Sequence, residues 1–319
     1  MASVSDLLKT IFTHMFLRFR RHFPRKLKLI VVDIIYKISG RRITFPYLMF
    51  EVHITDKCNL KCAGCGHFSS LSDVGGSGNL LDVESYEKDL KRISELMNGK
   101  IGRICLLGGE PLLHPYVKDF FTITRKYLPE INKSEETGIV QLVTNGILLH
   151  EQPDDFWEAC RKNNIVIVIS DYPVNIRVET IKDKALKFNV GLKFLGEELL
   201  FREAGSANRW TKIPIDLSGL QDNRKSFGKC YSAGVSFQLV NGKIFKCARI
   251  AFIDYFNTAF NKNLTVGEND YADIYKVKDG KELLRLLTEP ASFCRYCKTD
   301  STTWNNEWKV SNGLIEEWI

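Results

Sequence analysis

Between residues 48 and 194, short apolar runs alternate with longer segments in which apolar residues recur at helical spacing. The short runs predict strands at 48–54, 101–107, 139–143, 165–169 and 191–194, and the amphipathic segments predict helices at 83–97, 116–127, 154–162 and 178–188. Strands that alternate with helices in this way form parallel sheets with crossover helices. Polar and glycine-rich segments follow the strands, which predicts a site at the C-terminal edge of the sheet.

This alternation stops near residue 196. Residues 202–229 are polar and predicted to be irregular. A hairpin is then predicted from 235–240 to 243–245, because Asn241-Gly242 between them accepts the positive φ angles of a tight turn. A helix is predicted at 281–287.

The first 45 residues differ from the rest in both pattern and charge. They hold ten Lys or Arg against two Asp, a surplus of eight, whereas the whole chain of 319 residues carries +7. The remainder is therefore close to neutral, and docking of a basic terminus is more consistent with this pattern than a nucleic-acid-binding body. The apolar runs of residues 5–38 are too short to span a bilayer. They predict either a basic amphipathic segment on an anionic membrane surface or a helix pair packed on the protein.

Seven of the nine cysteines fall into two groups, and the sequence shows no signal peptide, so the grouped cysteines indicate metal ligands in a reducing cytosol rather than disulfides. In ITDKCNLKCAGCGHF, Cys58, Cys62 and Cys65 are close enough in sequence to converge on one centre, and soft thiolates suit iron–sulfur clusters, zinc or copper(I). A saturated cubane cluster requires four thiolates, so three would leave one iron open.

CxxxCxxC directly after a strand resembles the radical S-adenosylmethionine (radical SAM) superfamily. The resemblance implies that Cys58, Cys62 and Cys65 hold a [4Fe–4S] cluster whose open iron chelates S-adenosylmethionine (SAM). A zinc site with these cysteines, for which His67 could supply a fourth ligand, is the alternative.

Further motifs of this family follow the later strands. Gly108-Gly109-Glu110-Pro111 matches its GGEP motif, in which glycines allow close approach of the backbone and the carboxylate pairs with the methionyl ammonium of SAM. Asn145 and Ser170 match positions that contact the ribose or carboxylate of SAM. The residue before the third cysteine is usually aromatic and packs near adenine, but here it is Gly64, so Phe68 or His67 is expected to make that contact.

The second cysteine group comprises Cys230, Cys247, Cys294 and Cys297. A hairpin glycine followed by four residues and a cysteine resembles the SPASM/twitch extension of radical SAM enzymes, and four cysteines fit the shorter twitch form with one auxiliary [4Fe–4S] cluster. A structural zinc held by the same cysteines is the alternative. Cys105 and Cys160 are interpreted as buried apolar residues. Trp304, Trp308 and Trp318 are expected to cover the auxiliary site, to contact a partner, or only to pack on the domain.

The resemblance covers about residues 48–300 and implies a partial TIM-like (β/α) barrel with a small cluster-binding domain. The predicted division is a basic extension at 1–46, the radical SAM core at 47–200, a connecting segment at 201–229 and the twitch-like domain with its tail at 230–319. An external reductant such as flavodoxin or ferredoxin is implied. The expected location is cytoplasmic, with peripheral contact of residues 1–45 with the inner membrane face and no nucleic-acid partner.

The expected reaction is abstraction of a hydrogen atom by a 5′-deoxyadenosyl radical, followed by oxidation or epimerisation of a small polar substrate. The stretches CGHFSSL, LLGGEPLLHP, TNGILL and SDYP also resemble radical SAM proteins encoded beside sugar-modifying enzymes, which favours a carbohydrate or glycan. Arg249, His114 and Asp171 are candidates for a catalytic base by position only. The alternatives are a peptide-modifying maturase and a non-enzymatic metal protein that docks on membrane or nucleic acid.

Overall fold

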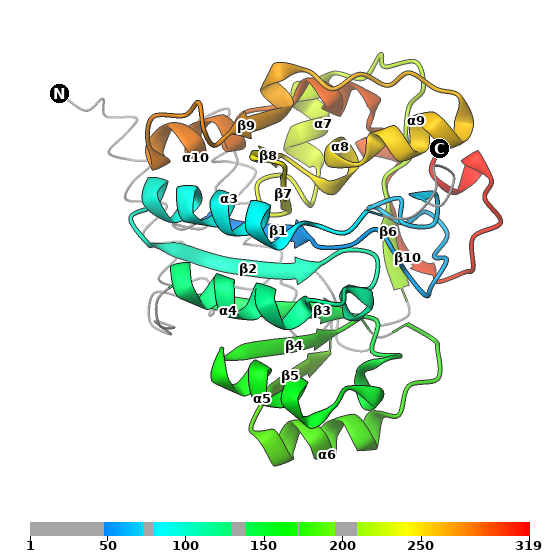
Figure 1. Cartoon of the computed structure of the whole chain (residues 1–319). Coiled ribbons are helices and arrows are strands. Elements are labelled where there is room, and N and C mark those ends of the chain that lie inside the picture. Colours follow the sequence, from blue (N-terminus) through cyan, green and yellow to red (C-terminus); the bar gives the residue numbers. More distant parts are fainter. Residues whose placement is uncertain (1–47, 73–78, 129–137, 171, 195–208) are drawn as a thin grey trace, which may run out of the picture.

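The fold is built around one eight-stranded sheet of order β5-β4-β3-β2-β1-β7-β8-β9. It is seen in a computed structural model that describes residues 48–72, 79–128, 138–170, 172–194 and 209–319 (Figure 1). Strands β1 to β5 and β7 run parallel, whereas β8 and β9 return antiparallel. The sheet is open, as a partial barrel requires, which confirms the predicted α/β class.

The first five strands alternate with four helices, as the sequence predicts. Their bounds are β1 Leu48–His53, α3 Val83–Leu96, β2 Ile101–Leu107, α4 Val117–Tyr127, β3 Ile139–Thr144, α5 Asp154–Lys162, β4 Ile165–Ile169, α6 Val178–Phe188 and β5 Gly191–Phe194. Local capping sets several of these ends. Asp82 accepts a hydrogen bond from the backbone of Ser85 at the start of α3, and Asn189 adopts the left-handed conformation after α6.

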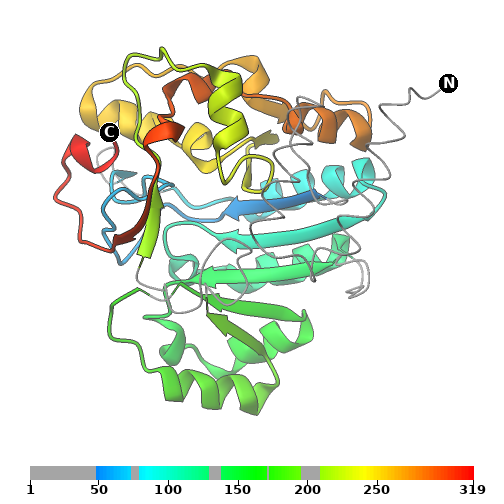
Figure 2. The same cartoon turned by 180° about the vertical axis from the view of Figure 1, so that it is seen from behind.

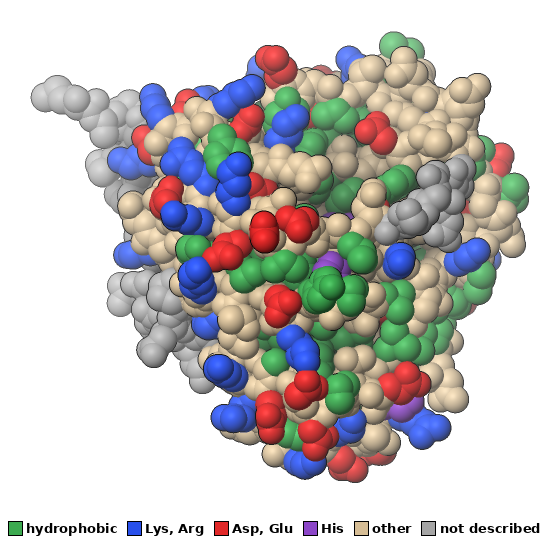
Figure 3. Space-filling model, viewed as in Figure 1, with side chains coloured by type: hydrophobic (Ala, Val, Ile, Leu, Met, Phe, Trp, Pro, Cys, Tyr) green, Lys and Arg blue, Asp and Glu red, His purple; other side chains and the backbone are tan. Residues whose placement is uncertain are grey.

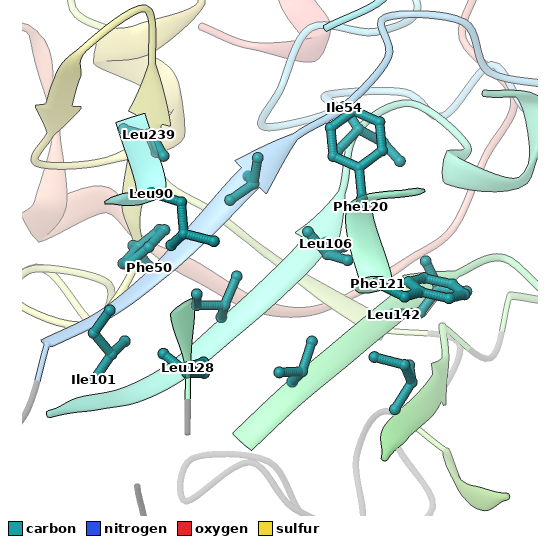
Figure 4. Close-up of a cluster of buried hydrophobic side chains, with 14 of the residues drawn as sticks. Phe50, Ile54, Leu90, Ile101, Leu106, Phe120, Phe121, Leu128, Leu142 and Leu239 are labelled. Carbon is teal, nitrogen blue, oxygen red and sulfur yellow. The ribbon is translucent and has the colours of Figure 1, made fainter. Parts of the chain in front are cut away.

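The main hydrophobic core lies between the sheet and helices α3, α4 and α5. Alternate strand residues such as Phe50, Leu106 and Leu142 point to this side. Figure 4 shows Phe50 beside Leu90 of α3, and Leu106 and Leu142 near Phe120 and Phe121 of α4. The residues between them point to the opposite face, which is turned towards the viewer in Figure 2 and is called the inner face below. The two faces of β1, β2 and β3 therefore differ in chemistry.

The C-terminal half is more regular than the sequence predicts. Its elements are β6 Arg209–Lys212, α7 Asn223–Lys229, β7 Phe237–Val240, β8 Lys243–Phe245, α8 Ala248–Ala251, α9 Ile253–Phe260, β9 Tyr271–Asp273, α10 Gly280–Thr288 and β10 Thr303–Glu307. The segment predicted to be irregular thus contains a strand and a helix. Strand β6 was missed because its partner is β10, almost a hundred residues further along the chain.

A second hydrophobic cluster joins this half to the loop after β1. It gathers Phe68, Ile215, Phe256, Phe293 and Trp318. The predicted hairpin pairs with β1 through β7, with Glu51 opposite Gln238, so strands β7 to β9 continue the sheet formed by β1 to β5. The boundary predicted at residue 230 stays a prediction.

Asp89 on α3 ties the core to this hairpin. Its buried carboxylate accepts hydrogen bonds from the Gly242 backbone N–H at 2.7 Å and from the Tyr275 hydroxyl at 2.7 Å. Asp89→Ala leaves the Gly242 N–H without its acceptor, so we expect the free energy of unfolding to fall by about 2–4 kcal/mol. Urea denaturation under anaerobic conditions measures this. Tyr275→Phe, which removes one bond only, should cost about 0.5–1.5 kcal/mol; equal losses in both variants would contradict the role given to Asp89.

The described surface mixes charges of both signs, and Figure 3 shows Lys and Arg interspersed with Asp and Glu over the helical face. No helix in the described part of the chain is long and apolar enough to cross a membrane. The predicted basic extension at 1–46 and its membrane contact lie outside the described residues.

Candidate functional site

The cysteine loop, residues 54–68, begins where β1 ends and is pressed against the turn after β2. Gly109 N–H donates to Thr55 O and Glu110 N–H to Lys57 O, both at 2.7 Å. A Cβ at Gly108 would lie 2.4 Å from Thr55 O, and one at Gly109 would lie 2.3 Å from Lys57 O. These two glycines therefore allow the turn to approach the cysteine loop, in addition to any contact with a ligand.

Glu110 links this turn to the end of β3. Its fully buried carboxylate accepts from the Thr144 hydroxyl at 2.7 Å and from the Asn145 backbone N–H at 2.8 Å. Burial raises the pKa of Glu110, while these hydrogen bonds favour its charged form. The Asn145 side chain in turn donates to Asn59 Oδ1 in the cysteine loop at 2.7 Å. Three segments that the sequence placed at one sheet edge are thus joined by hydrogen bonds.

Ser170 lies beside this network at the end of β4. Its backbone N–H donates to Thr144 O at 2.8 Å, and its side chain is buried. The SAM-contact roles expected for Gly108, Gly109, Glu110, Asn145 and Ser170 stay predictions.

The structure places the aromatic side chains around the cysteine loop differently from the sequence expectation. Phe68 is 0% exposed and packs on Phe256 and Trp318, so its enclosed ring is unsuited to contact adenine, and that expectation is corrected here. Gly64 has φ +67°, and a Cβ there would lie 2.4 Å from the ring of Trp210. Trp210 therefore occupies the space that an aromatic side chain at position 64 would need.

Residues 303–319, here called the C-terminal tail, hold the cysteine loop from the other side. Trp308 Nε1–H donates to Cys62 Sγ at 3.1 Å, and Trp318 Nε1–H donates to Cys65 O at 3.1 Å. Backbone hydrogen bonds join Ala63 N–H to Lys309 O and Ser311 N–H to Lys61 O. Trp308 and Trp318 thus cover the first cysteine group, whereas the ring of Trp304 is half exposed and lies near Tyr231.

The three thiols of the loop form a donor set that fits a cationic cluster. Burial is the main reason that the pKa of Cys58 is raised to about 12 and that of Cys62 to about 11. The negative charges of Glu110 and Cys65 contribute for Cys58, and that of Cys65 contributes for Cys62. Coordination to a metal would favour the thiolate form instead, because coordinated thiols are deprotonated. Among the described residues, no three His, Cys, Asp or Glu side chains are gathered closely enough to hold a single metal ion. Cluster ligands need not converge on one point, because each thiolate holds a different iron.

The auxiliary cysteines come from three separate segments. Cys230 follows α7, Cys247 follows β8, and Cys294 and Cys297 lie in and after the 3₁₀ helix Ser292–Tyr296. Their electrostatic interactions with one another raise the pKa values of Cys247 and Cys294, for which burial is the larger cause. The fold therefore places these cysteines within electrostatic reach of one another, and the shared metal centre stays a prediction.

The three candidates for a catalytic base have different surroundings. Arg249 Nη1 lies 3.9 Å from Cys297 Sγ, so it belongs to the surroundings of the auxiliary cysteines. His114 is buried on the helical side; its Nδ1 accepts from Tyr116 N–H at 3.1 Å and its Nε2 lies 3.2 Å from Leu81 O. With both ring nitrogens used in this way, His114 is structural, and its candidacy is corrected. Asp171 lies outside the described residues.

The remaining cysteines differ from each other. Cys160 is fully buried, as predicted. Cys105 is only half-buried and points to the inner face, where its thiol donates to Gln141 Oε1 at 3.4 Å. The interpretation of Cys105 as a buried apolar residue is therefore wrong, because strand alternation pairs it with Glu51 and Gln141 rather than with the core.

A polar cluster at the end of β1 was missed from the sequence. His53 Nε2 bonds Asp56 Oδ1 at 2.8 Å, and Asp56 Oδ2 accepts from the Tyr255 hydroxyl and from the Asn79 backbone. The stacked rings of His53 and His67 have centroids 5.5 Å apart. The signal was present, since Glu51 and His53 interrupt an otherwise apolar strand at a spacing of two residues.

Comparison with known proteins gives the following similarities. A sequence profile of the radical SAM superfamily matches residues 52–193. The GTP 3',8-cyclase of Clostridium perfringens strain 13 is 28% identical over 186 residues, which are 58% of this chain and 50% of that protein. The GTP 3',8-cyclase of Campylobacter fetus is 21% identical over 261 residues, covering 77% of this chain and 74% of that protein. This chain thus spans about half the length of the Clostridium relative it matches.

Two solved structures are also similar in fold. BtrN in complex with AdoMet and 2-DOIA has a TM-score of 0.46 and 18% identity, covering 80% of this chain and 94% of that one. Streptococcus suis SuiB bound to precursor peptide SuiA has a TM-score of 0.40 and 12% identity, covering 83% and 72%.

Proposed function

This chain carries a radical SAM domain at residues 52–193, and we propose that it abstracts a hydrogen atom from a small polar substrate, a carbohydrate or glycan, which is then oxidised or epimerised. The cofactors of such an enzyme are SAM and a [4Fe–4S] cluster, and it needs an external one-electron reductant. When bound, these cofactors supply the radical chemistry that converts SAM to 5′-deoxyadenosine. The enzymatic assignment replaces the non-enzymatic docking protein considered from the sequence.

The observation that carries the site assignment is the shared edge at which the cysteine loop, the Gly108-Gly109 turn and Asn145 meet. Cys58, Cys62 and Cys65 would hold the cluster. Glu110 and Asn145 would shape the SAM site, and Trp210 beside Gly64 would offer an aromatic surface there. The C-terminal tail would exclude water from the thiolates through Trp308 and Trp318.

The fate of the substrate depends on two further groups of the chain. The auxiliary cysteines would hold the second cluster, which supports oxidation, and Arg249 would offset their negative charge. The partly exposed thiol of Cys105 supports epimerisation, because a thiol can return a hydrogen atom to a carbon radical. The sulfur radical left on Cys105 would then take one electron from the external reductant and one proton from water. The proposed site contains a reagent for each outcome.

Substrate class is tested by anaerobic incubation of the reduced protein with SAM and one added compound at a time. Glycosides and sugar nucleotides form one set, GTP is included because the curated relatives are named for it, and short peptides form the other. We expect sugars to raise the yield of 5′-deoxyadenosine above the substrate-free level. Stimulation by peptides alone would reverse the choice in favour of a maturase. Cytoplasmic location and peripheral membrane contact stay predictions from the sequence.

Trp308 is expected to tune the SAM-binding cluster. Its N–H bond to Cys62 Sγ stabilises the more negative, reduced state, since hydrogen bonds to the sulfurs raise the reduction potential. A bond worth about 0.5–1.5 kcal/mol corresponds to roughly 20–60 mV for one electron, so Trp308→Phe should lower the midpoint potential by that amount. A redox titration followed by electron paramagnetic resonance measures it. Trp304→Phe on the same tail is the control; equal potentials in all three proteins would contradict the assignment.

A further inference from the structure

Four polar side chains cross the inner face in one row. Gln238 of β7, Glu51 of β1, Cys105 of β2 and Gln141 of β3 are register partners on neighbouring strands. Their neighbours along each strand, such as Phe50 and Leu106, point into the core instead. A sheet face that is only covered by other parts of the protein is usually apolar. The polar side chains of this row therefore need hydrogen-bond partners, because buried polar groups without partners are unfavourable.

The polar row meets the missed cluster at the end of β1. Glu51 Oε2 accepts a hydrogen bond from Gln238 Nε2 and lies 3.6 Å from His67 Nε2. The ring of Phe252 lies against both histidines, with centroids 4.4 Å from His53 and 5.6 Å from His67. One aromatic wall and several polar groups are typical of sites for small polar molecules.

Three buried atoms of this set have no hydrogen-bond partner among the described residues, namely Gln238 Oε1, His53 Nδ1 and His67 Nε2. Gln238 is 0% exposed and His53 is 9% exposed. A carboxylate only accepts, so Gln238 must turn its amide NH₂ towards Glu51, and its oxygen is the atom left over. His53 uses Nε2–H towards Asp56, which makes Nδ1 an acceptor. Burial lowers the pKa of His53, which favours this neutral form.

Gln238 Oε1 and His53 Nδ1 both accept hydrogen bonds, and so does the Glu51 carboxylate, which lies 3.6 Å from His67 Nε2. Acceptors that are buried without a partner destabilise the protein, and a ligand carrying several O–H donors would supply the missing hydrogen bonds. We infer that Glu51, His53, His67 and Gln238, with Phe252 as a wall, form a binding site for a polyhydroxylated ligand such as a sugar or cyclitol.

This assignment rests on the proposed function, because it gives the substrate of that reaction a location. His53 directly precedes the cysteine loop and His67 lies within it, and Cys105 lies beside Glu51 in the register. A sugar held by Glu51 and Gln238 would thus lie between the cysteine loop and the Cys105 thiol. The chain of Tyr255, Asp56 and His53 would fix the orientation of the His53 ring.

The test is ligand binding rather than turnover. Saturation-transfer NMR on the oxidised, reconstituted protein uses three probes: methyl α-D-glucopyranoside, myo-inositol and trialanine. We expect transfer to the sugar or the cyclitol and none to the peptide. Gln238→Met and Glu51→Gln each remove one contact, which should weaken binding roughly three- to tenfold, whereas Glu158→Gln, exposed on the outer helix α5, should bind as wild type.

Melting temperatures separate loss of binding from loss of folding. Gln238→Met removes an unpaired buried amide oxygen but also a bond to Glu51. The Glu51 side chain is 24% exposed, so at least the Glu51→Gln variant should keep the wild-type melting temperature. Absence of transfer from both hydroxylated probes, transfer from the peptide alone, or unchanged affinity in both variants would overturn the site. SAM cleavage is assayed separately. If the wild-type protein does not cleave SAM, the proposed function is wrong. If it cleaves SAM but both variants bind the sugar or cyclitol as tightly as wild type, only this inference is overturned.

Discussion

Cys58→Ala is expected to abolish formation of 5′-deoxyadenosine. The iron content is expected to fall from about eight to about four atoms per chain, because one of two [4Fe–4S] clusters would be lost. The reason is local. Cys58 lies at the end of β1, where its thiol is within electrostatic reach of Cys62, Cys65 and Glu110. Without Cys58, only two protein thiolates remain. Two irons of the cluster would then lack a protein ligand, whereas SAM binding requires a single open iron. Anaerobic reconstitution, iron and sulfide analysis, and chromatography of the products after reduction with SAM measure both effects.

Cys160→Ala is the matched control for this prediction. It makes the same chemical change at a cysteine that is buried in α5 and belongs to neither group. Its iron content and 5′-deoxyadenosine yield should equal those of wild type. If Cys58→Ala kept its iron, or if zinc replaced iron in the wild-type protein at this site, the assignment of the cysteine loop to a SAM-binding cluster would be wrong.

The parts of the fold that the sequence predicted are those set by local pattern. Each strand from β1 to β5 begins within one residue of its predicted position, because apolar runs bounded by polar turns leave little freedom. The meeting of Cys58, Glu110 and Asn145 at one edge also followed, since parallel strands bring their carboxyl ends together.

The contacts around the cysteine loop could not be predicted in this way. Trp210, Trp308 and Trp318 reach it from segments far along the chain, and no local pattern encodes which surface a tail will cover. Phe68 was expected beside adenine because it is near Cys65 in sequence. However, its backbone has a positive φ of 55°, and its ring packs in the second hydrophobic cluster.

The inner face could have been predicted in part. In β2, Arg103 and Cys105 alternate with Ile104 and Leu106, which assigns the two pairs to opposite faces. The environment predicted for Cys105 was wrong because the prediction used the residue type alone and not this alternation along β2. Partner choice within the face, such as Glu51 with Gln238, depends on β7 joining β1 and was beyond the sequence.

The auxiliary cysteines carry the prediction that separates the two chemical outcomes. Cys294→Ala combined with Cys297→Ala removes two of four ligands, so about four irons per chain should be lost while the cysteine loop keeps its own cluster. Formation of 5′-deoxyadenosine should continue, because the altered residues lie in and after the 3₁₀ helix Ser292–Tyr296, in a different segment from Cys58, Cys62 and Cys65. The oxidised product should disappear, since the electron of the substrate radical has lost its acceptor.

The same double variant distinguishes oxidation from epimerisation when the reaction is run in deuterated water. An epimerase that uses the Cys105 thiol would still deliver solvent-exchanged deuterium to the substrate carbon, and Cys105→Ala would stop this while leaving the auxiliary iron intact. An oxidase would show the reverse pattern. Zinc rather than iron in the wild-type auxiliary site would remove oxidation from the proposal, because zinc has no redox chemistry, and Cys105 on the inner face would then be the group that ends the reaction.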